Sequence, residues 1–338
     1  MPDTYTSQFS GEEIDSALRA AQIISGASTP AELREKLEIR GDTIPVSATD
    51  PTPVSEALSA SGGGVNPNLL DNWFFGRPVN QRGQTEWTAA NGYAIDRWKP
   101  TGSGKMSLTN DGLKCVDIYA HQFFEKGFIK KGTYTLSVLA DDTPNSFTGI
   151  LGFWGAHADI GYSVPKDNGF ATATIEVPQD YDDYNPFVYL GINHTFKAAK
   201  LELGDTQTLA HKENGVWALN EIPDYGEQLR RCQRYYYQSF EGSNPKTNKG
   251  ACAFIAGTAS SAPMALAFPV EMRTTPAVKI YSPQTGSESK AADWITDEDI
   301  SAACHTDFTN NKVLAINTYG NATIGKTYAF HYTASADL

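Results

Sequence analysis

The sequence has little positive charge and no long apolar run. Its 338 residues include 27 Lys and Arg against 39 Asp and Glu, which gives a net charge of −12. Nucleic-acid backbones are bound by clustered Lys and Arg, so we expect no nucleic-acid partner. A spanning helix needs a run of about 18 or more apolar residues, so we expect no membrane insertion. The N-terminal residues also lack the basic start and apolar stretch of a secretory signal.

Cysteine clusters and catalytic motifs are missing as well. No CxxC pair or His–Cys cluster at zinc spacing is present, and the four scattered cysteines are Cys115, Cys232, Cys252 and Cys304. We therefore expect reduced, mostly buried thiols rather than a disulfide framework. The sequence contains neither G-x-S-x-G nor HExxH, the marks of a hydrolase nucleophile and of a zinc protease. These absences predict that the protein is not an enzyme.

What the chain has in abundance is Gly, Ser, Thr, Asn and Tyr. Charged residues make up 20% of the chain, below the roughly 25% of average globular domains. This composition favours short strands and many turns over a helical bundle. Hydrophobic residues reach 40%, which is enough for buried cores, and the length suggests two or three domains.

Residues 1–65 differ in composition from the rest of the chain. Ser10 and Glu13 have the spacing of a capping box, which predicts a helix. One apolar stripe of coiled-coil spacing follows, formed by Ile14, Ala17, Ala21 and Ile24. Because so short a helix is marginal in water, its stripe would pack against the body of the chain or against copies of itself. A second short helix at Pro30 and a Pro-, Ser- and Gly-rich linker complete a predicted attachment arm.

Two stretches of the chain alternate apolar and polar residues, as strands do. In residues 66–204, the run GTYTLSVLA puts Leu136 and Val138 on one face, and several similar runs follow. They predict a β-sandwich or jelly roll. Residues 238–338 contain further alternating runs, such as NKVLAINTY, and predict a C-terminal β-sandwich knob.

Residues 205–237 are predicted to be a connection and a helix between the two β domains. The helix is expected after Pro223, where Leu229, Cys232 and Tyr236 have helical spacing. The predicted fold class is therefore mainly β, with short N-terminal helices, a jelly-roll β-sandwich, a connecting helix and a C-terminal β-sandwich knob.

Several motifs resemble those of tail-fibre and receptor-binding proteins of tailed bacteriophages and prophages. They are SGEEIDSALRAA, NLLDNWFFGRPVNQRGQ, IDRW, KLELG, DYGEQLRRCQRYYYQSF and FPVEMRTTPAV. The resemblance extends from about residue 7 to residue 282 and depends on the order of the motifs. It implies a homotrimer in the virion, made in the host cytoplasm, whose N-terminal arm joins a phage tail or baseplate protein. It also implies that the protein binds host cell-surface glycans without catalysis.

The resemblance assigns structural roles to the residues of its motifs. Trp73 and Trp98 are interpreted as core residues. The matched helix implies a subunit interface that includes Arg231, Cys232, Arg234, Tyr235 and Tyr236. The matched turn of the last domain contains Met272, Arg273 and Pro276.

A P-loop pattern, GNATIGKT, spans residues 320–327. In a nucleotide-binding protein this pattern leads into a helix. Here the following residues, YAFHYT, alternate as in a strand, so we interpret the pattern as a hairpin turn.

Aromatic residues next to Gly and polar residues are the candidates for ligand binding. Flat rings stack on the apolar C–H faces of sugars, while polar neighbours bind the hydroxyl groups. On this basis the predicted glycan-binding residues are Trp154, His157, Asp159, Tyr162, Tyr281 and Trp294. Each single aromatic residue could instead belong to a core.

The acidic stretch QDYDDYNP is a candidate calcium site. Clustered oxygen ligands bind Ca²⁺, and the ligands here would be Asp180, Asp182, Asp183 and Asn185. The first β domain also resembles carbohydrate-binding modules of jelly-roll type, which often hold a structural Ca²⁺, so this resemblance implies one here. The alternative is a solvated turn between strands, and we expect no other cofactor.

Two alternatives to glycan adhesion remain open. The chain could be a purely structural tail or baseplate component that binds no glycan. It could also be a polysaccharide depolymerase, which would need two carboxylates about 5–10 Å apart in a cleft. The sequence does not single out such a pair among its 39 acidic residues.

Overall fold

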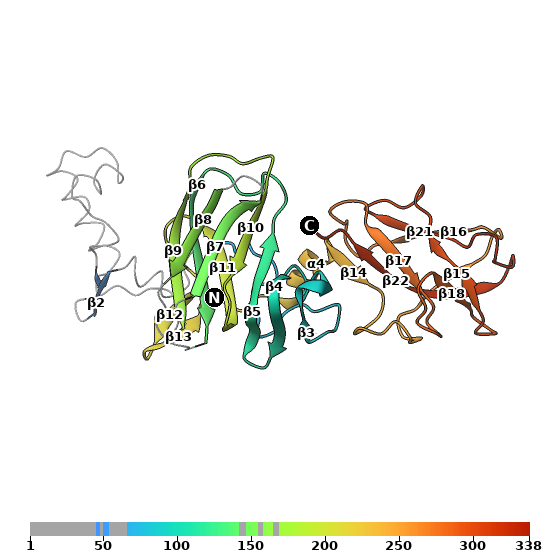
Figure 1. Cartoon of the computed structure of the whole chain (residues 1–338), viewed down its shortest axis with the longest axis horizontal. Coiled ribbons are helices and arrows are strands. Elements are labelled where there is room, and N and C mark those ends of the chain that lie inside the picture. The colour runs from blue at the N-terminus through green and yellow to red at the C-terminus, as the bar shows by residue number, and fades with distance from the viewer. Residues whose placement is uncertain (1–44, 48–49, 54–65, 142–146, 155–157, 165–168) are drawn as a thin grey trace, which may run out of the picture. The chain divides into compact units, whose positions relative to one another are not determined.

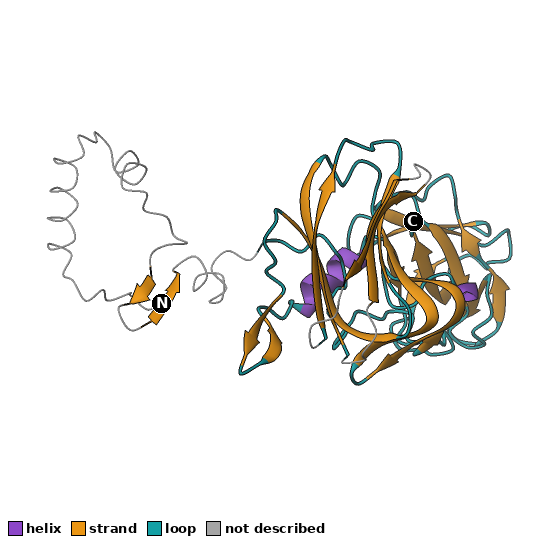
Figure 2. Cartoon of the chain, turned by 60° about the vertical axis from the view of Figure 1, so that its left-hand side comes forward, coloured by secondary structure: helices purple, strands orange, loops and turns teal. Residues whose placement is uncertain are grey.

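The computed structural model describes residues 45–47, 50–53, 66–141, 147–154, 158–164 and 169–338. Residues 1–65 and 66–338 belong to two compact units. In the first unit, β1 (Pro45–Ser47) and β2 (Asp50–Pro53) pair in an antiparallel hairpin within the predicted linker. The predicted N-terminal helices lie outside the described residues. The described part of the second unit is mainly β, as predicted (Figures 1 and 2).

The first β domain contains a short 3₁₀ helix and eleven strands of the described chain. They are β3 (Glu86–Trp87), η1 (Ala89–Asn91), β4 (Lys99–Thr109), β5 (Gly112–Phe123), β6 (Gly132–Ala140), β7 (Phe147–Trp154), β8 (Ala158–Val164), β9 (Phe170–Val177), β10 (Asn185–Leu190), β11 (His194–Leu203), β12 (Ala210–Glu213) and β13 (Val216–Leu219). Nine of these strands form one antiparallel sheet in the order β8-β7-β10-β5-β11-β6-β9, with β4 paired to β5 and β3 to β4. The first half of β5 pairs with β11 and its second half with β10. Strand β5 therefore links the two halves of the sheet.

Both halves of this sheet contribute to one core. Leu136 and Val138 of β6 are buried in the same cluster as Leu151 of β7 and Val188 of β10. Since β6 and β7 lie on opposite sides of β5 in the strand order, the sheet folds over itself as a β-sandwich. Trp73 and Trp98 are buried in this core, as predicted.

A hairpin follows the ninth strand of the sandwich. Strands β12 and β13 are joined by Asn214 and Gly215, both at positive φ, as two-residue hairpin turns require. The Trp217 ring stacks on Phe170 with centroids 4.0 Å apart, and Leu209 belongs to the sandwich core. Sequence analysis treated this segment as a plain connection, although the Asn-Gly pair signals the hairpin.

The connecting helix α4 (Tyr225–Gln233) begins where it was predicted but ends earlier, because Tyr236, predicted on its apolar face, lies in strand β14 (Tyr236–Gln238) instead. The Asp224 carboxylate caps its first turn by accepting a hydrogen bond from the Glu227 N–H at 2.8 Å. Cys232 is buried, and so is Gln228, whose side-chain oxygen accepts a bond from the Asn72 N–H at 2.7 Å. The helix therefore docks on the first domain through a polar contact as well as an apolar one.

The second β domain contains nine strands of the described chain. They are β14 (Tyr236–Gln238), β15 (Cys252–Ile255), β16 (Ser261–Ala267), β17 (Ala277–Tyr281), β18 (Lys290–Asp293), β19 (Asp299–Ser301), β20 (Ala303–Cys304), β21 (Val313–Asn317) and β22 (Thr327–Ser335). Strand β22 pairs with β14, β15, β17 and β18, while β16, β21 and β20 form a separate sheet. Phe254, Met272, Leu314 and Phe330 share the core between them. The P-loop pattern leads into strand β22 rather than into a helix, as interpreted.

The four thiols are free, and they are buried at Cys115 and Cys232 and half-buried at Cys252 and Cys304. Burial raises the pKa of the Cys115 thiol to about 12, which keeps it protonated. Within the described residues, no helix combines the length and the apolar character needed to cross a membrane.

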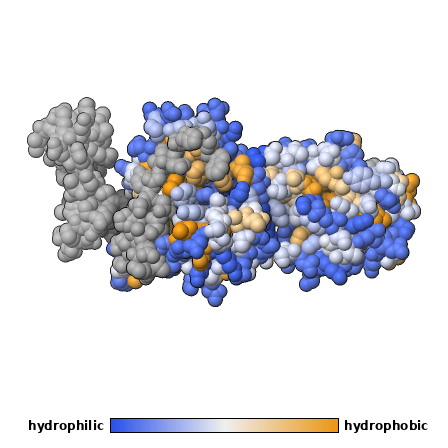
Figure 3. Space-filling view, viewed as in Figure 1, coloured by the Kyte–Doolittle hydropathy of each residue, from blue (hydrophilic) through white to orange (hydrophobic). Residues whose placement is uncertain are grey.

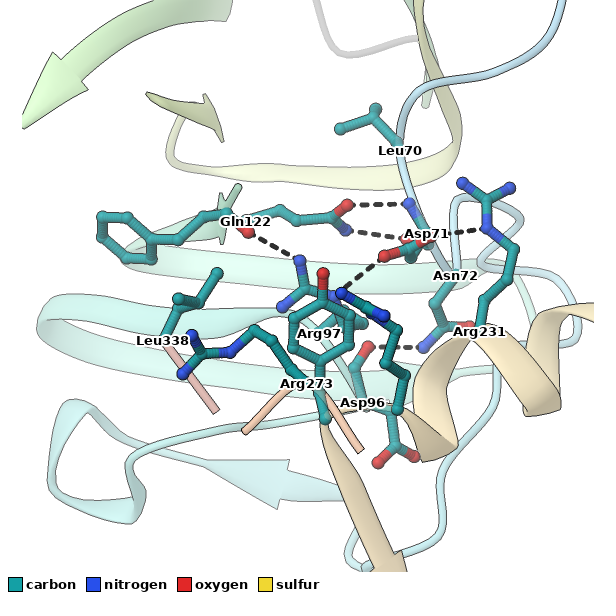
Figure 4. Close-up of polar contacts among 12 residues, drawn as sticks. Leu70, Asp71, Asn72, Asp96, Arg97, Gln122, Arg231, Arg273 and Leu338 are labelled. Atoms are coloured by element: carbon teal, nitrogen blue, oxygen red, sulfur yellow. Dashed lines mark hydrogen bonds and ion pairs between the residues drawn. The ribbon is translucent and has the colours of Figure 1, made fainter. Parts of the chain in front are cut away.

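The two β domains meet at a buried arginine (Figure 4). Arg97 is 1% exposed; its Nε lies 3.0 Å from Asp71 Oδ2, and its Nη2 donates to the Phe123 carbonyl at 2.6 Å. Its guanidinium lies 3.5 Å from the Tyr235 ring centroid. Asp71 also binds Nε of Arg231 at 2.7 Å. One carboxylate thus joins the first domain to the helix through two guanidinium groups.

A second arginine at the junction bonds to both domains. Arg82 pairs with Asp96 at 3.0 Å and with Asp337 at 2.6 Å, and its guanidinium lies 3.7 Å from the Tyr236 ring centroid. The Tyr93 hydroxyl donates to the Leu338 carbonyl at 2.5 Å and accepts from the Leu338 N–H. These contacts form an interface within the chain.

The motif residues therefore have intrachain partners. The resemblance implies a subunit interface that includes Arg231, Cys232, Arg234, Tyr235 and Tyr236. Within the chain these residues contact the first domain or lie at the junction, and a subunit interface stays a prediction. Arg234 pairs with Glu125 at 2.7 Å, and Arg273 bonds to the Ala336 carbonyl at 2.9 Å.

Candidate functional site

The turn between β18 and β19 holds Trp294 in a fixed position. The Asp293 N–H donates to Glu298 O at 2.8 Å, and the Trp294 N–H donates to Thr327 O at 2.9 Å. The Asp293 carboxylate accepts from the N–H groups of Ile295 and Thr296, at 2.9 and 3.1 Å. The backbone on both sides of Trp294 is thus fixed by hydrogen bonds, as a preorganised binding residue requires.

Asp293 holds this turn as an ionised group. Its Oδ2 lies 2.8 Å from Lys326 Nζ. The hydrogen bond from Lys326, together with those from the two backbone N–H groups, lowers the pKa of Asp293 to about 2. The carboxylate is therefore charged at neutral pH and has a structural partner.

Beside Trp294 lies a cavity of ≈ 250 Å³ with a small apolar floor and a polar rim. The floor is formed by Ala251, Ala292 and Ala329, and the rim by Asn248, Gln284 and Asp297. Ala292 of β18 and Ala329 of β22 are direct cross-strand partners, so two methyl groups stand where larger side chains would fill the space. Below the roughly 300 Å³ at which drug-sized pockets begin, this volume suits a single small ring.

The rim of the cavity is ordered by one amide. Gln284 Nε2 donates to Asp297 Oδ1 at 2.7 Å and to Asn248 Oδ1 at 3.2 Å. The Trp294 side chain is 59% exposed. An exposed flat ring beside oriented amide and carboxylate oxygens can stack on the C–H face of a sugar while its hydroxyl groups donate to the rim.

Tyr281, the second residue predicted in this domain, lines a different cavity. It is half-buried at the end of β17, and its ring lies 6.1 Å from that of Phe240. The cavity that it lines has a volume of ≈ 280 Å³ and lies at the junction of the two β domains. The structure therefore does not bring Tyr281 and Trp294 into one site.

The four predicted residues of the first domain belong to strands β7 and β8 or to the segment between them. By backbone register, Trp154 pairs with Asn185 of β10, Asp159 with Gly152, and Tyr162 with Gly149. Only the backbone positions of these three residues are described, and His157 lies outside the described residues. Their role in glycan binding stays a prediction.

An aromatic cluster lies on β10, which pairs with β7, and on β5 beyond it. Its members on β5 and β10 are Tyr119, His121, Phe123, Phe187 and Tyr189, with neighbouring ring centroids 5.0–6.4 Å apart. Burial and nearby Lys99 lower the pKa of His121 to about 4, so its ring is neutral at pH 7. Sequence analysis missed this cluster, although the alternation Tyr-x-His-x-Phe on β5 and Phe-x-Tyr on β10 signals it.

Three of the four predicted calcium ligands have protein partners. Asp182 pairs with Lys130 at 2.5 Å, Asp180 accepts from the Lys131 N–H at 2.7 Å, and the Asn185 amide donates to Phe124 O at 2.9 Å. Across the described ranges, no three His, Cys, Asp or Glu side chains gather as metal ligands do. Asp180, Asp182 and Asn185 thus already have partners in the turn, and calcium binding there stays a prediction.

No known protein family and no curated protein matches this sequence. Several solved structures are similar to parts of the chain. A CBM4 structure (17% identity, TM-score 0.24) matches 40% of this chain and 99% of its own. CBM35 from Cellvibrio japonicus Abf62 (16% identity, TM-score 0.22) matches 42% of this chain and 92% of its own. The enzymatically active domain of bacteriophage CBA120 tailspike protein 4 (12% identity, TM-score 0.23) matches 40% of this chain and 21% of its own.

At these low TM-scores the likenesses are partial, and the fold rests on the strand pairing and cores described above. The site likewise rests on its own geometry. Sequence analysis found Trp294 through its acidic, turn-like surroundings but missed Asn248, Gln284 and Asp297. Those residues come from three separate loops, and the first two loops carry only common turn residues, so no local pattern connects them.

Proposed function

We propose that this chain is a glycan-binding receptor-binding or tail-fibre protein of a phage-like particle, and that it acts without catalysis. The observation that carries the proposal is the cavity beside Trp294. An exposed indole, a floor of alanines and a rim of oriented oxygens together fit a neutral sugar ring. On the face of the C-terminal domain seen in Figure 3, apolar residues are interspersed with hydrophilic ones, which suits local contacts with a ligand in water.

The carboxylates of this cavity favour binding over hydrolysis. A glycosidase needs a general acid whose pKa is raised by its surroundings. The pKa of Asp293 is lowered to about 2 by Lys326 and by backbone N–H groups, and Asp297 accepts a bond from Gln284. Asp293 is therefore a poor proton donor at neutral pH, which supports adhesion rather than depolymerase activity.

The proposed attachment and oligomeric state are inferred from the sequence motifs that resemble those of phage tail-fibre proteins. Residues 1–65 would attach the chain to a phage tail or baseplate protein, and a homotrimer would present three copies of the pocket in the virion. Linked sites raise avidity by about 10²–10⁴ without any new contact. Weak binding at each pocket would thus be sufficient for attachment to a cell surface.

A direct test compares the full chain with Trp294→Ala on an array of host surface polysaccharides and neutral oligosaccharides. Removal of the stacking ring should weaken binding to the recognised glycan roughly tenfold or more. Tyr319→Ala is the matched control, because Tyr319 is also an exposed aromatic residue of the second domain, at 62%. It should bind as the unmodified chain does.

The alternatives predict other outcomes. A structural component would give a trimer, with a mass near three times 36.7 kDa by light scattering, and no binding to any glycan. A depolymerase would release reducing ends from the polysaccharide. Either result would overturn the adhesion proposal, and so would equal loss of binding in the two variants.

A further inference from the structure

The cavity at the junction of the two β domains contains residues from both. The first domain contributes Gln84, Asn91 and Tyr93, and the second contributes Tyr281, Ser243 and Thr333. At ≈ 280 Å³ the cavity is slightly larger than the one beside Trp294. Neither domain alone has these walls, so the cavity exists only because the junction holds the domains together.

Its tyrosine rings are fixed by the surrounding structure. Tyr93 is pinned by the two hydrogen bonds of its hydroxyl with Leu338. The Tyr236 hydroxyl donates to Gln238 Oε1 at 2.9 Å, and Tyr281 packs edge-on against Phe240. Rings that are held in this way lose little conformational entropy when a ligand stacks on them.

The close approach of two loops fixes one side of the cavity. A Cβ on Gly83, which has φ +65°, would lie 2.3 Å from the Gly242 Cα. Only glycine allows the backbones to come this close. Gln84 and Ser243, the neighbours of these glycines, both line the cavity and are exposed.

The charge of the cavity argues for an uncharged ligand. Arg82 is the basic residue of its lining, and its two terminal nitrogens already bind the carboxylates of Asp96 and Asp337. An anionic sugar would have to displace one of these buried partners. The remaining polar groups are amides and hydroxyls, such as Asn91, Ser243 and Thr333, which exchange hydrogen bonds with hydroxyl groups.

We propose that this interdomain cavity is a second carbohydrate site, selective for neutral sugars and separate from the Trp294 pocket. It needs no contribution from Trp294. Because both domains line it, a bound sugar stabilises the junction as well as occupying the site.

The test uses saturation-transfer NMR with the full chain and four probes. Three are neutral, namely methyl α-D-glucopyranoside, methyl β-D-galactopyranoside and N-acetylglucosamine, and the fourth is glucuronate. In Trp294→Ala, at least one neutral sugar should still receive saturation while glucuronate should not. Adding Tyr281→Ala should remove that signal, whereas adding Tyr319→Ala should leave it unchanged.

A second variant distinguishes loss of the site from misfolding of the Tyr281→Ala variant. Ser243 is exposed in a loop, so Ser243→Trp should block the mouth of the cavity without altering the core. It should abolish the signal in the Trp294→Ala background, as Tyr281→Ala does.

The outcomes separate the two sites. Complete loss of signal in Trp294→Ala alone would overturn the second site and leave the Trp294 pocket intact. Signal that is unaffected by Trp294→Ala but lost in Tyr281→Ala or Ser243→Trp would support the interdomain site and contradict the pocket of the proposed function. Glucuronate binding equal to that of the neutral sugars would overturn the selectivity, and no binding to the unmodified chain would overturn the proposal for these probes.

Discussion

At the junction of the two β domains, aromatic rings and carboxylates lie buried against guanidinium groups, whereas at the Trp294 pocket the same kinds of side chain face solvent. Arg97 is 1% exposed and holds Asp71 and the Tyr235 ring. Trp294 is 59% exposed and has an amide-ordered rim beside it. Residue type alone therefore does not separate structural from binding roles. What differs between the two regions is the exposure of the aromatic and charged groups to solvent.

The largest expected effect lies at the junction. Arg97→Ala would leave the buried Asp71 carboxylate with one guanidinium partner fewer, and breaking a buried pair costs about 3–5 kcal/mol. The midpoint of urea unfolding should fall accordingly. Arg230→Ala, at an exposed position of helix α4, should shift the free energy of unfolding by less than about 0.5 kcal/mol. Equal effects of the two substitutions would show that the junction does not depend on its buried charge.

The stability contributed by Asp96 at the junction and by Asp293 at the pocket should change with pH in opposite directions. Burial raises the pKa of Asp96 at the junction to about 6, whereas Lys326 and backbone N–H groups lower that of Asp293 to about 2. The folded chain therefore binds more protons at Asp96 than the unfolded chain between about pH 4 and 6, so this group stabilises the fold as the pH falls through 6. The contribution of Asp293 is present above about pH 4 and is lost as the pH falls towards 2.

Urea unfolding at several pH values checks this contrast. Relative to Asp96→Asn, the unmodified chain should gain on the order of 1 kcal/mol between pH 7 and pH 5. Relative to Asp293→Asn, it should lose stability only below pH 4. If both differences had the same sign, the two aspartates would not occupy the contrasting environments described here.

The smallest effect is expected at the rim of the pocket. Gln284→Ala removes the amide that orients Asp297 and Asn248, and one hydrogen bond contributes about 1 kcal/mol. Glycan binding should weaken about fivefold, with the urea midpoint unchanged. A loss of stability without a loss of affinity would place Gln284 among the structural residues instead.

The architecture of the molecule could largely be predicted from the sequence because it follows local patterns. Alternation in GTYTLSVLA predicted strand β6 and its buried Leu136 and Val138, although Thr135 and Ser137 on the other face are buried as well. The spacing of apolar residues after Pro223 predicted helix α4. The binding residues were harder to predict, because Asn248, Gln284 and Asp297 lie in three loops that come together only in the folded chain. The contacts at the junction could not be predicted, because a sequence does not distinguish contacts within a chain from contacts between chains.

Strand β22 has a consequence for the order in which the protein can fold as it is synthesised. It pairs with β14, β15, β17 and β18, all of which come before it in the chain. The larger sheet of the second domain therefore has no central strand until residues 327–335 leave the ribosome, whereas the strands of the first sandwich are complete more than a hundred residues earlier. The ion pair between Arg82 of the first domain and Asp337 of the second can therefore form only after nearly the whole chain has been synthesised.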